Sequence, residues 1–391
     1  MLADRIRSRR KSLGLTLLEA SEAVGVTRQY LSEVESGRQP GVATLLALTD
    51  LLTLPTEEWL PEFLKSETRI LPLIHLGEYL AGKGDIQGAF TVARHLRPLL
   101  RTTAKGHGRA FHLLGLLEYR RGHFGRALVW FRRAESATLR GASGISRGDA
   151  LYNTALAMRQ AGLFTASVRR FEKAAEVYQS NGDRVRSGYA WLSDANTFLR
   201  FQAYREALHA YRRASRCLRD DPWQFDAKLG EAICLGQVAS VSVALHALQG
   251  LAAPPKDVER QARLEYNLAV AFRRAENVGA AVQHILSAVA APESATEAFR
   301  GNALAELCLC LSMIGDVSGA FRAADQFARY SGSREPEDVA AIRLLSMHLG
   351  HPVDVPPPSS HPVLSYEQRL WATLSFITRP TARGHVPQRG V

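Results

Sequence analysis

Apolar residues in the first 65 positions recur with the spacing of α-helices, and they predict five short helices. Leu2, Ile6 and Leu13 fall on one face of the first helix, which we expect to pack inward. Gly14 is expected to end that helix, because glycine readily adopts the left-handed backbone that commonly follows a helix. Thr16 is then placed to cap the second helix with its hydroxyl oxygen.

The third predicted helix is bounded by two glycines. Gly25 supplies a left-handed turn before it, and the helix is predicted to begin at Thr27. Leu31 and Val34 lie three residues apart and form its buried face. Gly37 is expected to stop the helix. Other side chains of this short helix are therefore expected to point outward.

Two further helices complete this segment, one over residues 42–52 and one in a stretch after Pro61, which a first helical turn tolerates. Residues 1–66 are thus predicted to form one small all-α domain, the head. The head holds eight basic and nine acidic residues, a net charge of −1, whereas the rest of the chain carries +12. The positive charge of the protein is therefore concentrated outside the head.

The segment from residue 25 to residue 38 resembles the recognition helix of helix-turn-helix regulators of the phage-repressor and Cro type. The resemblance rests on residues that stand at that family's spacing: Gly25, Thr27, Leu31, Val34, Glu35 and Gly37. It implies that the exposed side chains meet base edges or phosphates of double-stranded DNA, namely Thr27, Arg28, Gln29, Tyr30, Glu33 and Arg38. It also implies a buried ion pair between Arg10 and Glu35.

The chemistry of these side chains agrees with the resemblance. In the major groove Arg binds guanine, Gln binds adenine, and Glu accepts a hydrogen bond from cytosine. Leu17 departs from the family, which commonly has a phosphate-binding Gln at that position, but the basic first helix offers replacement cations: Arg5, Arg7, Arg9 and Lys11. The alternative interpretation of residues 1–66 is a helical bundle without a nucleic-acid role.

From residue 69 onward the sequence repeats with a period near 40 residues. A small residue is followed four positions later by an aromatic one and three positions after that by another small one. The clearest copies are Ala127, Phe131 and Ala134, then Ser167, Phe171 and Ala174, then Ala207, Tyr211 and Ala214. Weaker copies centred on Ala89, Ala244, Ala281 and Ala320 bring the total to about seven units.

Residues 113–134 resemble the helix pair of a tetratricopeptide repeat, with Gly115, Gly122, Ala127 and Phe131 among the residues at that motif's positions. The resemblance implies an all-α solenoid over residues 67–335, in which each repeat contacts only its neighbours. HEAT-type repeats fit the period better and the order of residue types worse, so they remain an alternative. We expect capping helices with a Pro-rich spacer over residues 336–379 and a disordered tail over residues 380–391.

In tetratricopeptide arrays the first helix of each pair lines a concave groove, and polar residues recur at the corresponding positions here. We expect a ligand site that includes Tyr152, Asn153, Arg159, Asn196, Arg200, Tyr266, Asn267 and Arg273. Asparagine is unfavourable inside helices, and its amide both donates and accepts, so a ladder of amides suits the backbone of an extended peptide. Seven arginines against Asp149, Asp226 and Glu306 predict a groove charge of about +4, suited to an acidic ligand. The alternative is a solvated groove without a ligand.

The combination of this head with a long repeat array resembles the peptide-pheromone-responsive regulators of Gram-positive bacteria and their phages, the RRNPP family. That resemblance implies a homodimer whose array binds a signalling peptide and thereby alters DNA binding, a form of quorum sensing. Two other interpretations stay open: a protein-interaction scaffold with a helical head, and a regulator whose repeats only dimerise.

Composition excludes several other classes of protein. Hydrophobic residues make up 46% and charged residues 22% of the chain, which are ordinary values for folded proteins. No apolar run is long enough to span a membrane, so we expect a soluble, cytoplasmic protein. The four cysteines are expected to be buried small hydrophobes. A G-x-S-x-G pattern at residues 144–148 lacks the preceding strand of a nucleophile elbow, so we predict no enzyme, no cofactor and no metal site.

Overall fold

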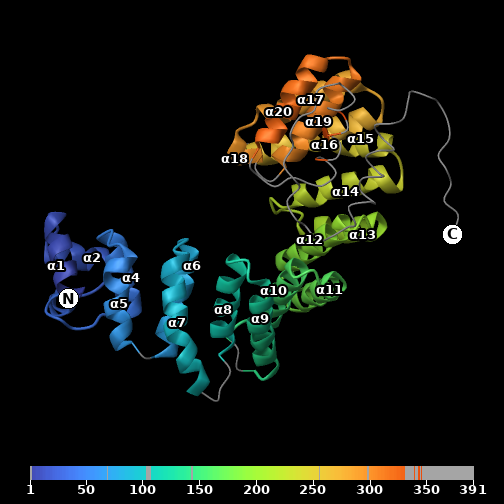
Figure 1. The fold of residues 1–391 in the computed structure, drawn as a ribbon. Helices are drawn as coiled ribbons and strands as arrows, with labels where there is room; N and C mark the ends of the chain where they lie inside the picture. Colours follow the sequence, from blue (N-terminus) through green and yellow to red (C-terminus); the bar gives the residue numbers. More distant parts are fainter. Residues whose placement is uncertain are drawn as a thin grey trace. The chain divides into compact units, whose positions relative to one another are not determined.

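The structure, a computed structural model, describes residues 2–67, 69–102, 107–141, 144–254, 256–296 and 299–330, together with Val339, Ile342, Arg343 and Leu345. Every regular element among these residues is a helix, and the helices are numbered along the chain (Figure 1). The chain divides into two compact units, residues 1–170 and residues 171–391.

The head contains the five predicted helices: α1 (Leu2–Ser12), α2 (Leu17–Ala23), α3 (Arg28–Glu35), α4 (Val42–Leu51) and α5 (Thr56–Ser66). Thr16 caps α2 as predicted, and its hydroxyl accepts a hydrogen bond from the Glu19 amide at 3.1 Å while the Glu19 carboxylate accepts one from the Thr16 amide. Gly25 has φ +69°, the left-handed conformation that the turn before α3 was expected to need.

Two expectations for the head are wrong. Leu13 is 44% exposed, because α1 ends at Ser12 and leaves Leu13 outside the face that buries Leu2 and Ile6. The fifth helix begins at Thr56 rather than after Pro61, so the proline lies inside it. A proline within a helix removes one backbone hydrogen bond. Buried side chains on both sides of it, such as Trp59 and Phe63, hold this helix in place by packing.

Antiparallel helix pairs follow within each unit of the described chain, and they confirm the predicted repeats. The pairs of the first unit are α6 (Ile70–Gly82) with α7 (Ile86–Thr102) and α8 (Gly108–Arg120) with α9 (Phe124–Leu139), and α10 (Arg147–Gln160) follows them. The boundary between the units lies within the next helix, α11 (Phe164–Ser180). The pairs of the second unit are α12 (Arg184–Arg200) with α13 (Tyr204–Cys217), α14 (Gln224–Val238) with α15 (Val241–Gln249), α16 (Val258–Arg274) with α17 (Val278–Ala290), and α19 (Arg300–Met313) with α20 (Val317–Arg329). A short helix, α18 (Glu293–Thr296), lies between the last two pairs.

The repeated small and aromatic residues hold the two helices of a pair together. Ala127, Phe131 and Ala134 of α9 are all buried, as are their counterparts in α11 and α13. The Phe131 ring lies so close to Gly115 of α8 that a Cβ atom on this glycine would stand 2.5 Å from it. The small residue is therefore needed for the close approach of an aromatic ring to a helix backbone.

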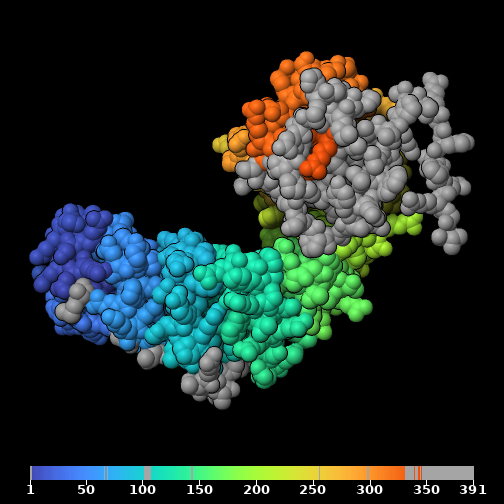
Figure 2. Space-filling view, viewed as in Figure 1, coloured from blue at the N-terminus to red at the C-terminus, as the bar shows by residue number. Residues whose placement is uncertain are grey.

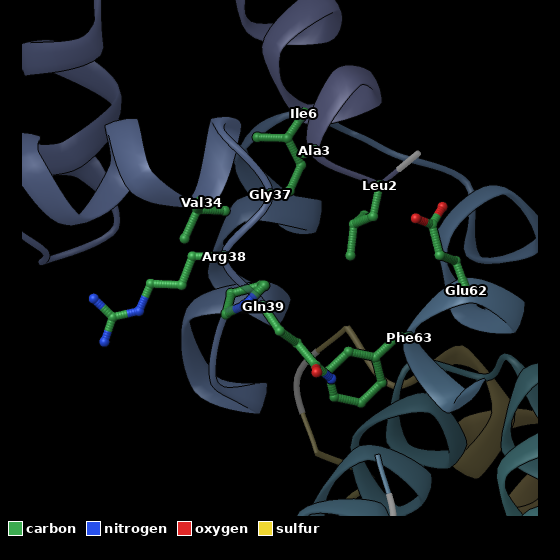
Figure 3. Close-up of a pocket in the computed structure, with 10 residues that line it drawn as sticks. Leu2, Ala3, Ile6, Val34, Gly37, Arg38, Gln39, Glu62 and Phe63 are labelled. Carbon is green, nitrogen blue, oxygen red and sulfur yellow. The ribbon is translucent and has the colours of Figure 1, made fainter. Parts of the chain in front are cut away.

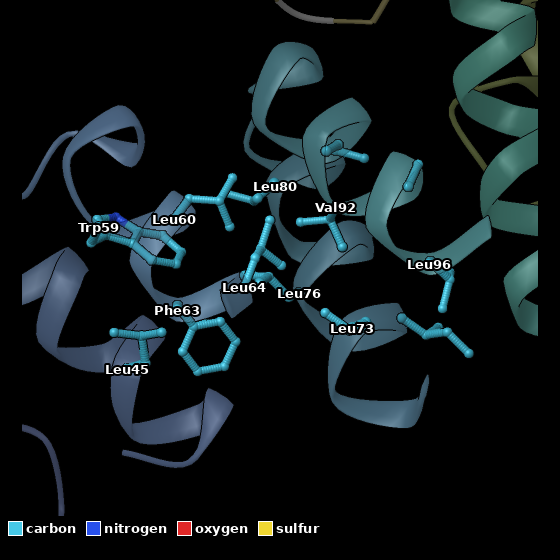
Figure 4. Close-up of a cluster of buried hydrophobic side chains, with 14 of the residues drawn as sticks. Leu45, Trp59, Leu60, Phe63, Leu64, Leu73, Leu76, Leu80, Val92 and Leu96 are labelled. Atoms are coloured by element: carbon cyan, nitrogen blue, oxygen red, sulfur yellow. The ribbon is translucent and has the colours of Figure 1, made fainter. Parts of the chain in front are cut away.

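The core of the head continues into the first repeats without interruption. Trp59, Phe63 and Leu64 of α5 share one cluster of buried side chains with Leu73 of α6 and Val92 of α7 (Figure 4). Figure 2 shows a continuous surface from the head to α9. The head and the first repeats thus belong to one compact unit.

The predicted capping region and tail fall largely outside the described residues. Within residues 336–379 the structure describes only Val339, Ile342, Arg343 and Leu345, and the three apolar ones are buried against the last repeat. The predicted spacer at 356–358 and the tail at 380–391 lie outside the described residues.

Candidate nucleic-acid interface and repeat surface

The third helix of the head presents an exposed polar face. Thr27 caps it, and its hydroxyl accepts a hydrogen bond from the Tyr30 amide at 3.2 Å. Leu31 and Val34 are buried as predicted, whereas Arg28 and Gln29 are exposed. The short helix therefore has one face fixed in the core and two side chains with base-reading chemistry directed outward.

The remaining polar residues of this face form a connected network. The Gln29 amide donates to Glu33 at 3.3 Å, and the Arg38 guanidinium pairs with the same carboxylate. Arg38 also lies over the Tyr30 ring, 4.8 Å from its centroid, and the Tyr30 hydroxyl accepts a hydrogen bond from the Gly41 amide. The hydrogen bond from Arg38 lowers the pKa of Glu33, so this carboxylate is held in its charged, accepting form.

The predicted ion pair between the first and third helices is confirmed. Arg10 donates to Glu35 through two parallel hydrogen bonds, from Nε to Oε1 at 2.6 Å and from Nη2 to Oε2 at 2.9 Å. Its Nη1 donates to the Leu15 carbonyl oxygen at 2.7 Å. Both charged side chains are buried, and the bond to Glu35 raises the pKa of Arg10. The pair therefore joins the end of α1 to the end of α3.

The basic residues of α1 have different surroundings. Arg5 donates to the Glu58 carbonyl oxygen, and Arg9 donates to the Leu52 carbonyl oxygen and the Thr53 hydroxyl, each at 3.0 Å. Two of the four cations that were expected to replace the missing phosphate anchor are thus attached to the end of α4 and to α5.

A small pocket lies beside the end of α3, between α1 and α5 (Figure 3). Its lining is mostly apolar and includes Leu2, Ile6, Val34 and Phe63. The Arg38 side chain lines its rim and points away from these residues in Figure 3. The loop that carries Arg38 is therefore seated on the core of the head.

In the first unit, the predicted groove residues lie on α10. Tyr152, Asn153 and Arg159 are half-buried. The amide nitrogen of Asn153 is 2.8 Å from the Asp149 carbonyl oxygen and 2.9 Å from Nε2 of His112 in α8. Burial lowers the pKa of His112, which favours the neutral ring that accepts such a bond. Asn153 therefore joins two successive repeats.

In the second unit, Asn196 and Arg200 of α12 are exposed, and the Asn196 carbonyl oxygen accepts a hydrogen bond from the Tyr211 hydroxyl at 2.6 Å. Tyr266 packs against Phe299, and the Asn267 amide donates to the Arg263 carbonyl oxygen at 2.7 Å. Tyr266 and Asn267 are both half-buried. The donor groups of Asn153 and Asn267 thus bind the carbonyl four residues earlier, a relation that the sequence spacing did not reveal.

The predicted exposure of Arg273 is wrong. This residue is buried at 8% exposure and forms two hydrogen bonds to Glu306 of α19, which is itself buried. Asp226, which was also placed on the exposed face, is buried between Arg260 and Arg263. Each pairing joins helices of successive repeats and satisfies charges that burial would otherwise leave uncompensated.

The predicted groove charge falls only from about +4 to about +3, because Glu78 is the one carboxylate among these partners that was not already counted. Three of its seven arginines are held by carboxylates, since Arg109 pairs with Glu78, Arg263 with Asp226 and Arg273 with Glu306. Glu78 was not included in the sequence-based charge. Among the described residues, no group of three or more potential ligands could hold a metal ion, and no helix is long and apolar enough to cross a membrane.

Residues 6–59 match the model of the helix-turn-helix family. The head is a helix-turn-helix domain. By fold, the chain is similar to the apo form of RapI, with a TM-score of 0.53 and 10% identity over 79% of this chain and 86% of that one. It is also similar to a tetratricopeptide repeat protein from Parabacteroides merdae, with a TM-score of 0.52 and 15% identity over 71% of this chain and 98% of that one. These likenesses show the fold: a helical solenoid of tetratricopeptide type follows the domain. No curated protein matches the chain in sequence.

Proposed function

We propose that the protein is a homodimeric transcriptional regulator that reads an inverted DNA repeat through α3. The exposed pair Arg28 and Gln29, on a helix capped by Thr27 and locked by the Arg10–Glu35 pair, is the observation that carries this proposal. A dimer of such heads binds two half-sites about one helical turn, or a multiple of it, apart. The role of the repeats is then to hold two heads at that spacing.

Selection of binding sites from random DNA tests the reading face. Arg28→Ala is expected to remove the preference at one base position in each half-site and to cost about 1–3 kcal/mol in affinity. Lys11→Ala removes the same charge from exposed α1, so it serves as a matched control that changes affinity uniformly for all sequences. An unchanged base preference in the Arg28 variant would rule out α3 as the reading helix. A sedimentation mass of one protomer on each duplex would rule out the dimer.

We further propose that a short peptide binds the repeats and alters the affinity for DNA. The support is the set of side-chain amides at related positions of three repeats, Asn153, Asn196 and Asn267, together with the resemblance of the whole architecture to peptide-responsive regulators. A peptide that favours one state of the array by about 1–3 kcal/mol changes the affinity for DNA about 5- to 150-fold, and DNA changes the affinity for peptide by the same factor.

Calorimetry with fractionated peptides from culture supernatant, with and without the selected operator, tests this second proposal. Replacing the three asparagines by Ala is expected to weaken peptide binding and to leave DNA binding without peptide unchanged. Asn181→Ala, at an exposed turn after α11, is the control. Full peptide affinity in the triple variant would refute the amide ladder. No saturable binding of any fraction would leave a regulator whose repeats only dimerise.

A further inference from the structure

The net positive charge of the chain is confined to one segment. Residues 67–170 hold 17 basic and six acidic residues, a net charge of +11, which equals the charge of the entire chain. The head carries −1 and residues 171–391 carry +1. This segment comprises α6 to α10 and the start of α11, and it belongs to the same compact unit as the head. The charge excess therefore directly follows the DNA-reading domain.

Five of the six acidic residues of this segment already bind other groups within it. Glu78 pairs with Arg109, Glu118 with Arg97, and Glu135 with Arg170. Glu67 pairs with Arg69, and Asp85 caps the first turn of α7 by accepting a hydrogen bond from the Gly88 amide. These carboxylates consequently leave most of the arginines in the segment unneutralised.

Four of the remaining arginines lie along one side of α9, the last of them directly after its final residue, Leu139. Arg126, Arg132, Arg133 and Arg140, the α9 arginine face, are all exposed. At 3.6 residues per turn they fall within an arc of about 120° on the helix, and Arg126 and Arg140 are about 21 Å apart along its axis. Glu135 lies outside this arc, and no carboxylate among the described residues pairs with any of the four.

The surroundings of this face suit a phosphate. The face borders an open hollow lined by Phe111 of α8 and Ser136 of α9, and the Arg133 guanidinium lies 4.8 Å from the centroid of the Trp130 ring. Arg binds phosphate through two parallel hydrogen bonds, and its weak hydration makes such contacts favourable. A row of guanidiniums without acidic neighbours is complementary to a polyanion.

We propose that the α9 arginine face binds the phosphate backbone of DNA beside the base pairs that α3 reads. This inference rests on the proposed function. A continuous core runs from α1 to α8, and Figure 4 shows its part from α4 to α7. This core joins the head to α8, the helix that pairs with α9. Packed helices are 8–10 Å apart, so α9, four helices after α5, lies within about 40 Å of the head, about one turn of DNA. The operator contacts therefore extend beyond the half-site by about one turn.

The test compares the salt dependence of binding for two duplexes that contain the selected operator, one trimmed to the two half-sites and one with about 15 further base pairs on each side. The variant replaces Arg132, Arg133 and Arg140 by Gln in the full chain. Its matched control replaces three exposed arginines of the second unit by Gln: Arg205, Arg216 and Arg219. Both triple variants change the net charge equally.

Each phosphate contact contributes about 0.9 to the slope of log affinity against log salt concentration. On the long duplex the α9 variant is expected to lower the slope by up to about 2.7 for each bound protomer, and on the short duplex to leave it near that of the parent. Equal slopes for variant and parent on the long duplex would overturn the inference and leave the reading role of α3 intact. An equal decrease in the control variant would also overturn it, since net charge alone would then explain the effect. Absence of any DNA binding by the parent protein would overturn both proposals.

Discussion

Asp194 of α12 gives the second unit a pH-dependent stability that a single substitution removes. Its side chain is 1% exposed, and its Oδ1 has no hydrogen-bond partner. Burial raises the pKa of Asp194 to about 8. The nearby charge of Glu172 in α11 adds to this increase, and Arg213 in α13 partly offsets it. The folded protein therefore keeps this carboxyl protonated at neutral pH, whereas the unfolded chain ionises it near pH 3.8.

The sign of the effect follows from which state binds the proton. Between pH 3.8 and about 8 the folded state holds a proton that the unfolded state has lost, so the free energy of unfolding decreases as the pH rises. Each pH unit is worth about 1.36 kcal/mol, which sets an upper limit of about 6 kcal/mol for the full passage. Asp194→Asn keeps the size of the side chain and stays neutral, so the variant lacks this decrease.

Hydrogen exchange measured by mass spectrometry on α12 and α13 peptides, corrected for the intrinsic effect of pH, reports the local free energy of opening. This measurement is preferred to a global melt because two compact units need not unfold together. The Asp194→Asn variant is expected to be increasingly more protected than the parent from about pH 5 to about pH 8. Asp220→Asn, at an exposed site after α13, controls for the loss of a carboxylate. A constant difference between the parent and the Asp194→Asn variant across this range would show that Asp194 is ionised in the fold and would refute the reasoning.

Three further predictions concern stability. Arg10→Met or Glu35→Leu alone is expected to lower the free energy of unfolding by about 3–5 kcal/mol, because a buried charge loses its partner. The double replacement is expected to cost less than the sum of the two, as measured by hydrogen exchange of α1 and α3 during urea unfolding of the full chain. Additive losses would show that the two groups are independent. Gly115→Ala is expected to cost about 1–3 kcal/mol in exchange protection of α8 and α9, because its Cβ meets the Phe131 ring at 2.5 Å; unchanged protection would mean that the ring moves freely. Thr16→Ala is expected to cost about 1 kcal/mol through loss of the capping box, with protection of the α2 amides as the readout; full protection would contradict this role of the cap.

The repeat architecture was predictable because it depends on local pattern. Small and aromatic residues at a fixed period locate the contacts within each helix pair, and Ala127 and Phe131 are buried as that pattern requires. The limits of α2 and α3 were predictable for the same reason, since Thr16 and Thr27 act on amides only a few residues away. The start of α5 was not, because tertiary packing of Trp59 outweighs the local effect of Pro61.

The electrostatic environment of the candidate site was much less predictable. Arg273 and Glu306 are 33 residues apart, and only the packing of α16 against α19 shows that they neutralise each other. Similarly, His112 contacts Asn153 from the preceding repeat. A helical face read from one repeat identifies which positions point toward a groove, but the partner of each charge comes from a neighbouring repeat. Position along one helix therefore gives the charges near a groove, but not which of them already pair with each other.

In the regulator that we propose, the core shared by the head and the first repeats limits how peptide binding alters DNA binding. Because Leu64 of α5 packs in the same cluster as Leu73 of α6, the head is not a module on a flexible tether. Further links reinforce this junction: Lys83 of the α6–α7 turn pairs with Asp50 of α4 at 3.3 Å, and His95 of α7 lies 3.0 Å from the Glu67 carbonyl oxygen after α5. Freeing the head would expose this cluster to water, at a cost of about 25 cal/mol for each Å² of apolar surface. Such a cost exceeds the roughly 1–3 kcal/mol typical of coupling between two sites once a few leucine side chains are exposed. In the dimer that we propose, changes in the spacing of the two heads leave this core intact, and they are therefore the less costly way to control DNA binding.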